Sequence, residues 1–128
     1  MRKKILLVDD SPFFLKALLD ALSENFEVET ASSGEMAIDL LKKIDSATSG
    51  KDEPFDLIIT DLEMPGLSGY DIAQFIKIKN RKSKFTPVIM LTGKDITKEE
   101  ARAYGCASYI PKGNLGKVVS MAQILLSK

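Results

Sequence analysis

The feature that most constrains the fold is a regular alternation of short apolar runs with longer segments of helical periodicity. Three runs are continuously apolar and rich in β-branched residues: Ile5–Val8, Leu57–Thr60 and Val88–Leu91. Such runs are typical of strands that are buried on both faces of a parallel sheet. Two weaker runs, Glu27–Ala31 and Ser108–Ile110, suit strands nearer the edges of the sheet.

The segments that separate and follow these runs carry the pattern of helices. The expected helices cover residues 12–24, 34–44, 70–79, 97–104 and 115–126. Ser11 and Ser33 can cap the first two, and Pro12 occupies the first helical position, where its missing N–H costs nothing. The alternation predicts an α/β fold with a parallel sheet, helices on both faces and right-handed crossovers.

Length and composition indicate one globular domain. The chain has 128 residues, about the size of one domain, and 45% of them are apolar, which is ordinary for a packed core. We expect a single domain over residues 1–128 with one long polar loop, Asp45–Pro54. The apolar run after Met1–Lys4 is too short for a signal peptide or a membrane span, so we expect a cytoplasmic protein.

Charge and residue usage exclude several classes of function. Lysine and arginine total 18, as do aspartate and glutamate, and this zero net charge disfavours a nucleic-acid binder held by bulk charge. There is no histidine, which excludes Ser-His-Asp and Cys-His catalysis and the usual zinc sites. The available nucleophile is then a carboxylate, which can carry a phosphoryl group.

Side chains suited to that chemistry follow four of the five expected strands. They are Asp9 and Asp10 after the first strand, Asp61 after the third, Thr92 after the fourth and Lys112 after the fifth. Each is common in a turn or a cap by itself, but the carboxyl ends of parallel strands share one edge, where such sheets bind ligands. Three carboxylates there would repel one another unless a hard cation such as Mg²⁺ joined them.

These residues together resemble the signature of response-regulator receiver domains. The matching segments are Val8–Ser11, Ile59–Gly69, Leu91–Gly93 and Tyr109–Lys112, and the resemblance covers essentially the whole chain. It implies a flavodoxin-like, doubly wound sheet of five parallel strands in the order 2-1-3-4-5, with five helices. It also implies a signalling switch that catalyses only its own aspartyl phosphorylation and dephosphorylation, and so is no enzyme acting on other substrates.

The resemblance assigns a phosphoacceptor and a metal site. Asp61 resembles the residue that takes a phosphoryl group from a histidine kinase or a histidine phosphotransfer protein. Asp10 resembles a direct Mg²⁺ ligand, and Asp9 resembles one that acts through water. Asp61 itself and the backbone carbonyl of Glu63 match the remaining ligands.

The resemblance also assigns the residues that respond to phosphorylation. Thr92 resembles the switch hydroxyl, Lys112 the lysine that contacts the phosphate, and Tyr109 the aromatic residue that turns inward on activation. The signal is expected to pass to a downstream output protein or domain, with no direct contact to nucleic acid or membrane. Glu63 and Lys94 match two positions that tune self-hydrolysis in the family. Their opposite charges either reach across and partly cover the acyl phosphate, or are two solvated loop charges that never meet.

The connection after Lys112 departs from the family pattern. Gly113 stands where the family usually has a proline, often in a cis peptide. We therefore expect the pair Gly113 and Asn114 to make the bend with positive φ.

Two apolar surfaces have two interpretations each. Leu15 and Leu19 fall at the edge of the apolar stripe of the first helix, so they belong either to the margin of the core or to a docking patch for a histidine-bearing partner. Ile124 projects away from the core face of the last helix. It is either an isolated exposed residue or part of a surface for an output partner or a homodimer.

Two other functions fit parts of the pattern. A Mg²⁺-dependent phosphatase with an aspartyl nucleophile would use Glu63, two residues after Asp61, as its general acid, but would need a cap domain over the substrate. A flavin- or nucleotide-binding module would need a phosphate loop after the first strand, where Asp9–Pro12 places negative charge instead.

Overall fold

The computed structural model describes residues 2–46, 53–79, 85–93, 96–103, 105–106 and 108–127. Strands and helices alternate along these residues as predicted, with boundaries that differ from the expected ones by two residues at most. The strands are β1 (Lys4–Val8), β2 (Glu27–Ala31), β3 (Leu57–Asp61), β4 (Val88–Thr92) and β5 (Ser108–Pro111). The helices are α1 (Pro12–Leu22), α2 (Gly34–Ser46), α3 (Gly69–Lys79), α4 (Lys98–Ala103) and α5 (Leu115–Leu125).

The strands form one parallel sheet in the order β2-β1-β3-β4-β5, which confirms the predicted fold. Strands β3 and β4 are buried along their whole length, and β1 is buried from Ile5 onward. The edge strands β2 and β5 are partly exposed, as their weaker apolar patterns predicted. From β1 the chain first adds β2 on one side and then β3, β4 and β5 on the other, so the strand order changes direction between β1 and β3. The carboxyl ends of these two strands lie side by side at that point.

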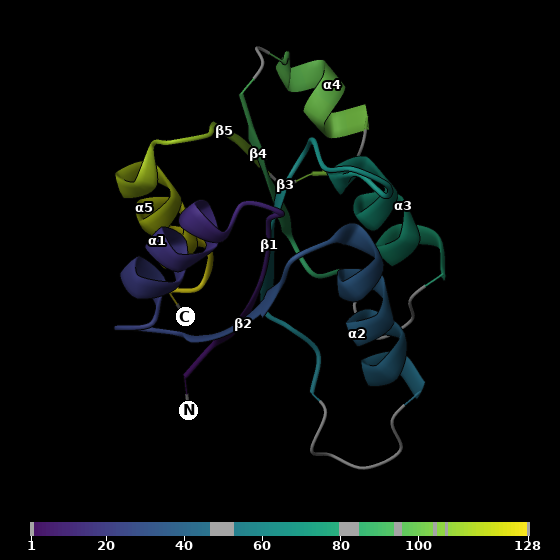
Figure 1. Ribbon diagram of the computed structural model, residues 1–128, viewed down its shortest axis with the longest axis horizontal. Coiled ribbons are helices and arrows are strands. Elements are labelled where there is room, and N and C mark those ends of the chain that lie inside the picture. The colour runs from purple at the N-terminus through teal and green to yellow at the C-terminus, as the bar shows by residue number, and fades with distance from the viewer. Residues whose placement is uncertain are drawn as a thin grey trace.

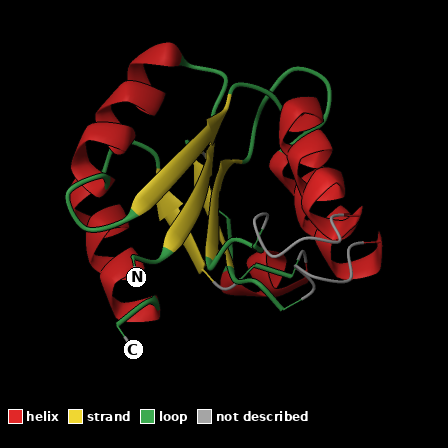
Figure 2. Ribbon diagram, turned by 90° about the horizontal axis from the view of Figure 1, so that it is seen from below, coloured by secondary structure: helices red, strands yellow, loops and turns green. Residues whose placement is uncertain are grey.

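Helices cover both faces of the sheet (Figures 1 and 2). Because side chains alternate along a strand, neighbouring residues of β3 pack into different layers. Ile58 belongs to the apolar core under α2 and α3, whereas Ile59 belongs to the core under α1 and α5. The two layers fix the strands from both sides, so the residues that follow the strands are presented at one edge.

Helix starts follow the predicted caps. The Ser11 hydroxyl accepts a hydrogen bond from the amide of Phe14 at 3.4 Å, and Pro12 is the first residue of α1. The Ser33 hydroxyl accepts one from the amide of Met36 at 3.1 Å. In the part of the chain that the structure describes, no helix is long and apolar enough to cross a membrane.

Two predicted boundaries are corrected. Helix α1 ends at Leu22 instead of Glu24, because Leu22 is its last buried apolar residue and exposed polar residues follow it. Helix α2 continues to Ser46, so the first two residues of the predicted loop 45–54 are helical. Residues 47–52 of that loop lie outside the described residues.

Candidate functional site

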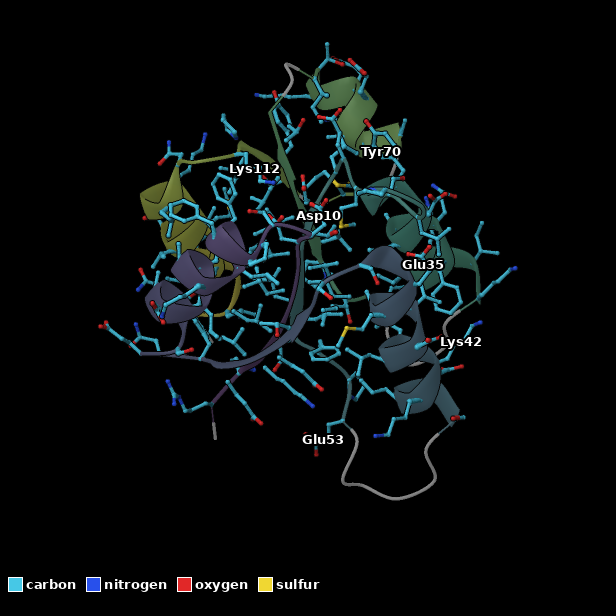
Figure 3. The ribbon with its side chains drawn as sticks, viewed as in Figure 1. Asp10, Glu35, Lys42, Glu53, Tyr70 and Lys112 are labelled. Carbon is cyan, nitrogen blue, oxygen red and sulfur yellow. The ribbon has the colours of Figure 1, made fainter. Side chains whose placement is uncertain are left out.

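Three carboxylates meet at the carboxyl end of the sheet. One oxygen from each of Asp9, Asp10 and Asp61 lies within 4.8 Å of the other two. Val8 pairs with Thr60 across β1 and β3, so Asp9 and Asp61 follow at the same level of the sheet. Asp9 and Asp61 are buried and Asp10 is exposed. Figure 3 shows Asp10 at the end of β1, between the two helical layers.

Lys112 lies against this cluster. Its ammonium is 2.9 Å from Asp61 Oδ2 and 3.3 Å from Asp9 Oδ1, and its amide donates a hydrogen bond to the Thr92 carbonyl at 2.8 Å. Burial lowers the pKa of Lys112, but the charges and hydrogen bonds of the two carboxylates outweigh this effect and raise the pKa above its usual value. The lysine is therefore a fixed positive charge beside Asp61.

Asp9 is the most constrained of the carboxylates. Its Oδ1 accepts hydrogen bonds from the amide of Ser11 and from Lys112, whereas its buried Oδ2 has no hydrogen-bond partner among the described residues. Burial raises the pKa of Asp9, and the charge of Asp61 raises it further. A buried acceptor without a donor, facing two more carboxylates, fits an oxygen-preferring divalent cation such as Mg²⁺.

Glu63 contributes its backbone to the site. Its amide donates a hydrogen bond to Asp61 Oδ1 at 3.3 Å, which fixes the orientation of that carboxylate. Its side chain is exposed and lines a groove of about 650 Å³ with Tyr70 and Ile96. Lys94 lies outside the described residues, so the reach of Glu63 and Lys94 across the site stays a prediction.

A pocket of about 660 Å³ opens between α4, β5 and α5, and the three residues predicted to sense phosphorylation all line it. Thr92 is buried, whereas Tyr109 and Lys112 are half-buried. Lys112, which contacts Asp9 and Asp61, therefore belongs both to the acidic cluster and to the lining of this pocket.

The connection after Lys112 confirms one half of its prediction and corrects the other. Gly113 has a φ of +102°, the left-handed region that glycine adopts without strain. Asn114 has a φ of −90°, so the prediction of positive φ at both residues is wrong. One left-handed residue suffices for the bend, which leaves Asn114 free to cap α5 by accepting a hydrogen bond from the amide of Lys117.

The apolar residues of α1 are arranged differently from the predicted docking patch. Leu15 and Leu19 are half-buried and pack against the core under α1 and α5, as the core-margin interpretation predicts. The exposed apolar residue is Phe13, which is 75% exposed, and sequence reasoning missed it. Its neighbour Phe14 lies against Lys112, with the ammonium 4.6 Å from the centre of the ring. The only sequence signal was a pair of aromatic residues directly after Pro12, at the helix that begins beside the site.

Comparison with known proteins identifies the family of this chain. The family described as "Response regulator receiver domain" matches residues 5–123. The transcriptional regulatory protein CpxR of Escherichia coli is 36% identical over 112 residues, which are 85% of this chain and 42% of that protein. This chain spans 23% to 50% of the length of three further curated relatives, a cyclic di-GMP phosphodiesterase and two transcriptional regulators.

Two solved structures are similar along nearly all of the chain. The chemotaxis response regulator CheY4 of Vibrio cholerae is 30% identical with a TM-score of 0.80, covering 98% of this chain and 100% of that one. The response regulator TrrA of Thermotoga maritima, in complex with Mg²⁺-BeF, is 32% identical with a TM-score of 0.76, covering 97% and 99%. On the match over residues 5–123 and this common fold, the chain belongs to the response regulator receiver domain family.

Proposed function

We propose that residues 1–128 form a single receiver domain that acts as a phosphorylation-driven switch. Asp61 accepts a phosphoryl group from a phosphohistidine on a histidine kinase or a histidine phosphotransfer protein. The observation that carries this proposal is the position of Asp61, buried among carboxylates with its Oδ2 2.9 Å from the Lys112 ammonium. The family supports the same role.

The transfer needs positioning and charge neutralisation more than covalent help from the protein. An oxygen of Asp61 attacks the phosphorus, and an O–P bond forms as the P–N bond to the donor imidazole breaks. The electron pair of that bond leaves with the imidazole nitrogen, which takes up a proton. The Glu63 amide holds the attacking carboxylate, and Lys112 neutralises negative charge on the phosphoryl oxygens.

The carboxylates of Asp9, Asp10 and Asp61 and the carbonyl of Glu63 would hold Mg²⁺. When bound, this ion neutralises charge on the carboxylates and on the phosphoryl oxygens. The buried Oδ2 of Asp9, which has no hydrogen-bond partner in the described part of the chain, supports this assignment, and so does the Mg²⁺-BeF in the similar TrrA structure. These four residues are also the ligands that the family resemblance implies.

The switch acts through the pocket between α4, β5 and α5. The Thr92 hydroxyl would contact the phosphoryl group, and Tyr109 would occupy the space that Thr92 leaves. This is a two-state equilibrium that the phosphoryl group biases through contacts present in only one state. The altered face of α4, β5 and α5 would signal to an output protein or domain.

The phosphoacceptor is tested by incubating the protein with acetyl phosphate and Mg²⁺. We expect one phosphate per chain, which hydroxylamine removes, and none in Asp61→Asn or in EDTA. A matched control is Asp56→Asn. Asp56 directly precedes β3, at the end of the strand away from the site, and its carboxylate accepts a hydrogen bond from the Lys4 amide at 2.8 Å. Labelling in Asp61→Asn equal to wild type, or labelling that persists in EDTA, would refute the proposal.

A further inference from the structure

The Lys112 ammonium has a third neighbour besides its two carboxylates. It lies 4.6 Å from the centre of the Phe14 ring, within the distance at which a cation is attracted to an aromatic face. Phe14 belongs to the first turn of α1, and Lys112 to the connection after β5. The ammonium therefore contacts both the acidic cluster and an aromatic ring from α1.

The backbone is constrained before Lys112 but not after it. The amide of Lys112 is bonded to the Thr92 carbonyl, but Gly113 follows directly with a φ of +102°, and a Cβ there would meet no atom within 4 Å. Glycine restricts the chain far less than the proline that the family usually has at this position. A lysine side chain has many rotamers, so its direction must be set by what its end contacts.

Phe14 is well placed to set that direction. Its amide is bonded to the Ser11 cap, and its ring is half-buried. The Phe13 ring meets the Phe14 ring edge-on, with centroids 5.5 Å apart and planes at 82°. The ring is thus fixed by a helix start and by a neighbouring ring, and its contact with Lys112 depends on neither carboxylate.

We propose that Phe14 is a positioning residue that holds the Lys112 ammonium over the phosphoacceptor side of the site. Asp9 and Asp61 hold the same ammonium here, but a carboxylate that accepts a phosphoryl group or binds a cation can no longer do so unchanged. The ring contact remains through that change and keeps the charge aimed at the transferred group. This inference rests on the proposed phosphorylation of Asp61.

The first test measures the contact itself, without metal or phosphate. A ring below the ammonium shifts the NMR signals of the Lys112 ε-methylene protons upfield. We expect this shift in wild type and in Phe14→Tyr, and its loss in Phe14→Leu. Phe75→Leu is the matched control. It removes a different ring, whose centre lies 5.9 Å from the ammonium of Lys42 on the side of the sheet covered by α2 and α3. Unshifted Lys112 signals in the wild-type protein would overturn the proposal.

The second test measures phosphorylation by acetyl phosphate with Mg²⁺. Phe14→Leu is expected to lower the maximal rate by roughly threefold to tenfold, while the half-saturating phosphodonor concentration stays near wild type. Phe14→Tyr should restore the rate, because it restores an aromatic face, and Phe75→Leu should leave the rate unchanged. A wild-type rate in Phe14→Leu, or an equal loss in Phe14→Tyr, would refute the positioning role. Absence of labelling in the wild-type protein would instead refute the proposed function.

Discussion

Asp9 is the residue of the site whose burial costs the most free energy. It is completely buried, its Oδ2 lacks a hydrogen-bond donor among the described residues, and two other carboxylates are close by. Burying an ionised carboxylate is costly, and Lys112 compensates for only part of the negative charge of the cluster. The folded protein therefore carries a destabilising residue whose arrangement suits a cation.

Asp9→Asn should make the metal-free protein more stable at pH 7, by about 1 kcal/mol, because it removes a buried charge. The pKa of Asp9 is raised in the folded state, so folding is disfavoured once the pH exceeds its ordinary value of 3.8. Urea unfolding should therefore show the gain at pH 7 and its disappearance as the pH falls below about 4.

Urea unfolding in the presence of Mg²⁺ distinguishes the loss of a metal ligand in Asp9→Asn from the removal of a buried charge. Wild type should gain about 1.4 kcal/mol at a Mg²⁺ concentration tenfold above its dissociation constant, and Asp9→Asn should gain much less. Asp39→Asn, an exposed substitution on α2, is the control and should behave like wild type. An equal Mg²⁺ gain in Asp9→Asn would contradict the ligand assignment.

Among the elements, α3 begins in close contact with the end of β3, the strand that carries Asp61. Its first residue, Gly69, donates a hydrogen bond to the Leu62 carbonyl at 3.0 Å. A Cβ at Gly69 would lie 2.6 Å from the backbone oxygen of Asp61 and 2.6 Å from the sulfur of Met90. The start of α3 therefore lies directly against the backbone of Asp61, and only a residue without a side chain fits there.

Gly69→Ala is expected to destabilise the protein by about 1–3 kcal/mol and to slow phosphorylation, because the added methyl displaces the Asp61 backbone. Gly116→Ala is the matched control. A Cβ at Gly116, in α5, would have no atom of the described residues within 4 Å, so alanine should stabilise the helix by up to about 1 kcal/mol. Denaturant unfolding and the acetyl phosphate rate distinguish the two variants, and equal effects would mean that the Gly69 contact does not constrain the site.

The face formed by α4, β5 and α5 should respond to the phosphorylated state. Fluoroberyllate with Mg²⁺ imitates the phosphoryl group and should shift the NMR signals of Tyr109 and of the residues that line the adjoining pocket in the wild-type protein. The shifts should be much smaller in Thr92→Ala, because the Thr92 hydroxyl is the contact that couples the phosphoryl group to Tyr109. Thr86→Ala is the control. Thr86 precedes β4, at the end of the strand away from the site, and its hydroxyl donates a hydrogen bond to the Phe55 carbonyl. Shifts of equal size in Thr92→Ala would disprove the coupling.

At the scale of the whole molecule, one sheet serves two apolar layers. Ile58 and Ile59 are adjacent in β3, are both fully buried, and belong to different layers. Neither layer can form without the sheet, and the site lies at the sheet edge between them. The stability of the site and of both cores should therefore be a single property of the molecule.

Ile58→Ala and Ile59→Ala should each destabilise the protein by about 2–5 kcal/mol, because each opens a cavity in a closely packed layer. Both variants should still unfold in one transition that circular dichroism and the Tyr109 NMR signals report at the same urea concentration. Val28→Ala, on the partly exposed edge strand β2, should cost less. Two separate transitions would show that the layers unfold independently.

The sequence by itself determined the central strands, the helix caps and the edge at which the site lies. Apolar runs such as Ile5–Val8 and caps such as Ser11 and Ser33 act through local periodicity and local hydrogen bonds, so they are readable along the chain. The carboxylates of Asp9, Asp10 and Asp61 were predictable as a group because parallel strands bring their carboxyl ends together.

Only the tertiary structure decided the contacts between side chains that are far apart in the sequence. Three such features are the contact of the Phe14 ring with the Lys112 ammonium, the burial of the Asp9 carboxylate and the closeness of Gly69 to Asp61. All of them depend on how α1, α3 and β5 pack on the sheet. Periodicity specifies which face of an element is buried, but not which atoms meet across the packed layers. The residues that gather at the site were therefore readable from the chain, whereas the contacts that position their side chains arise from the packing.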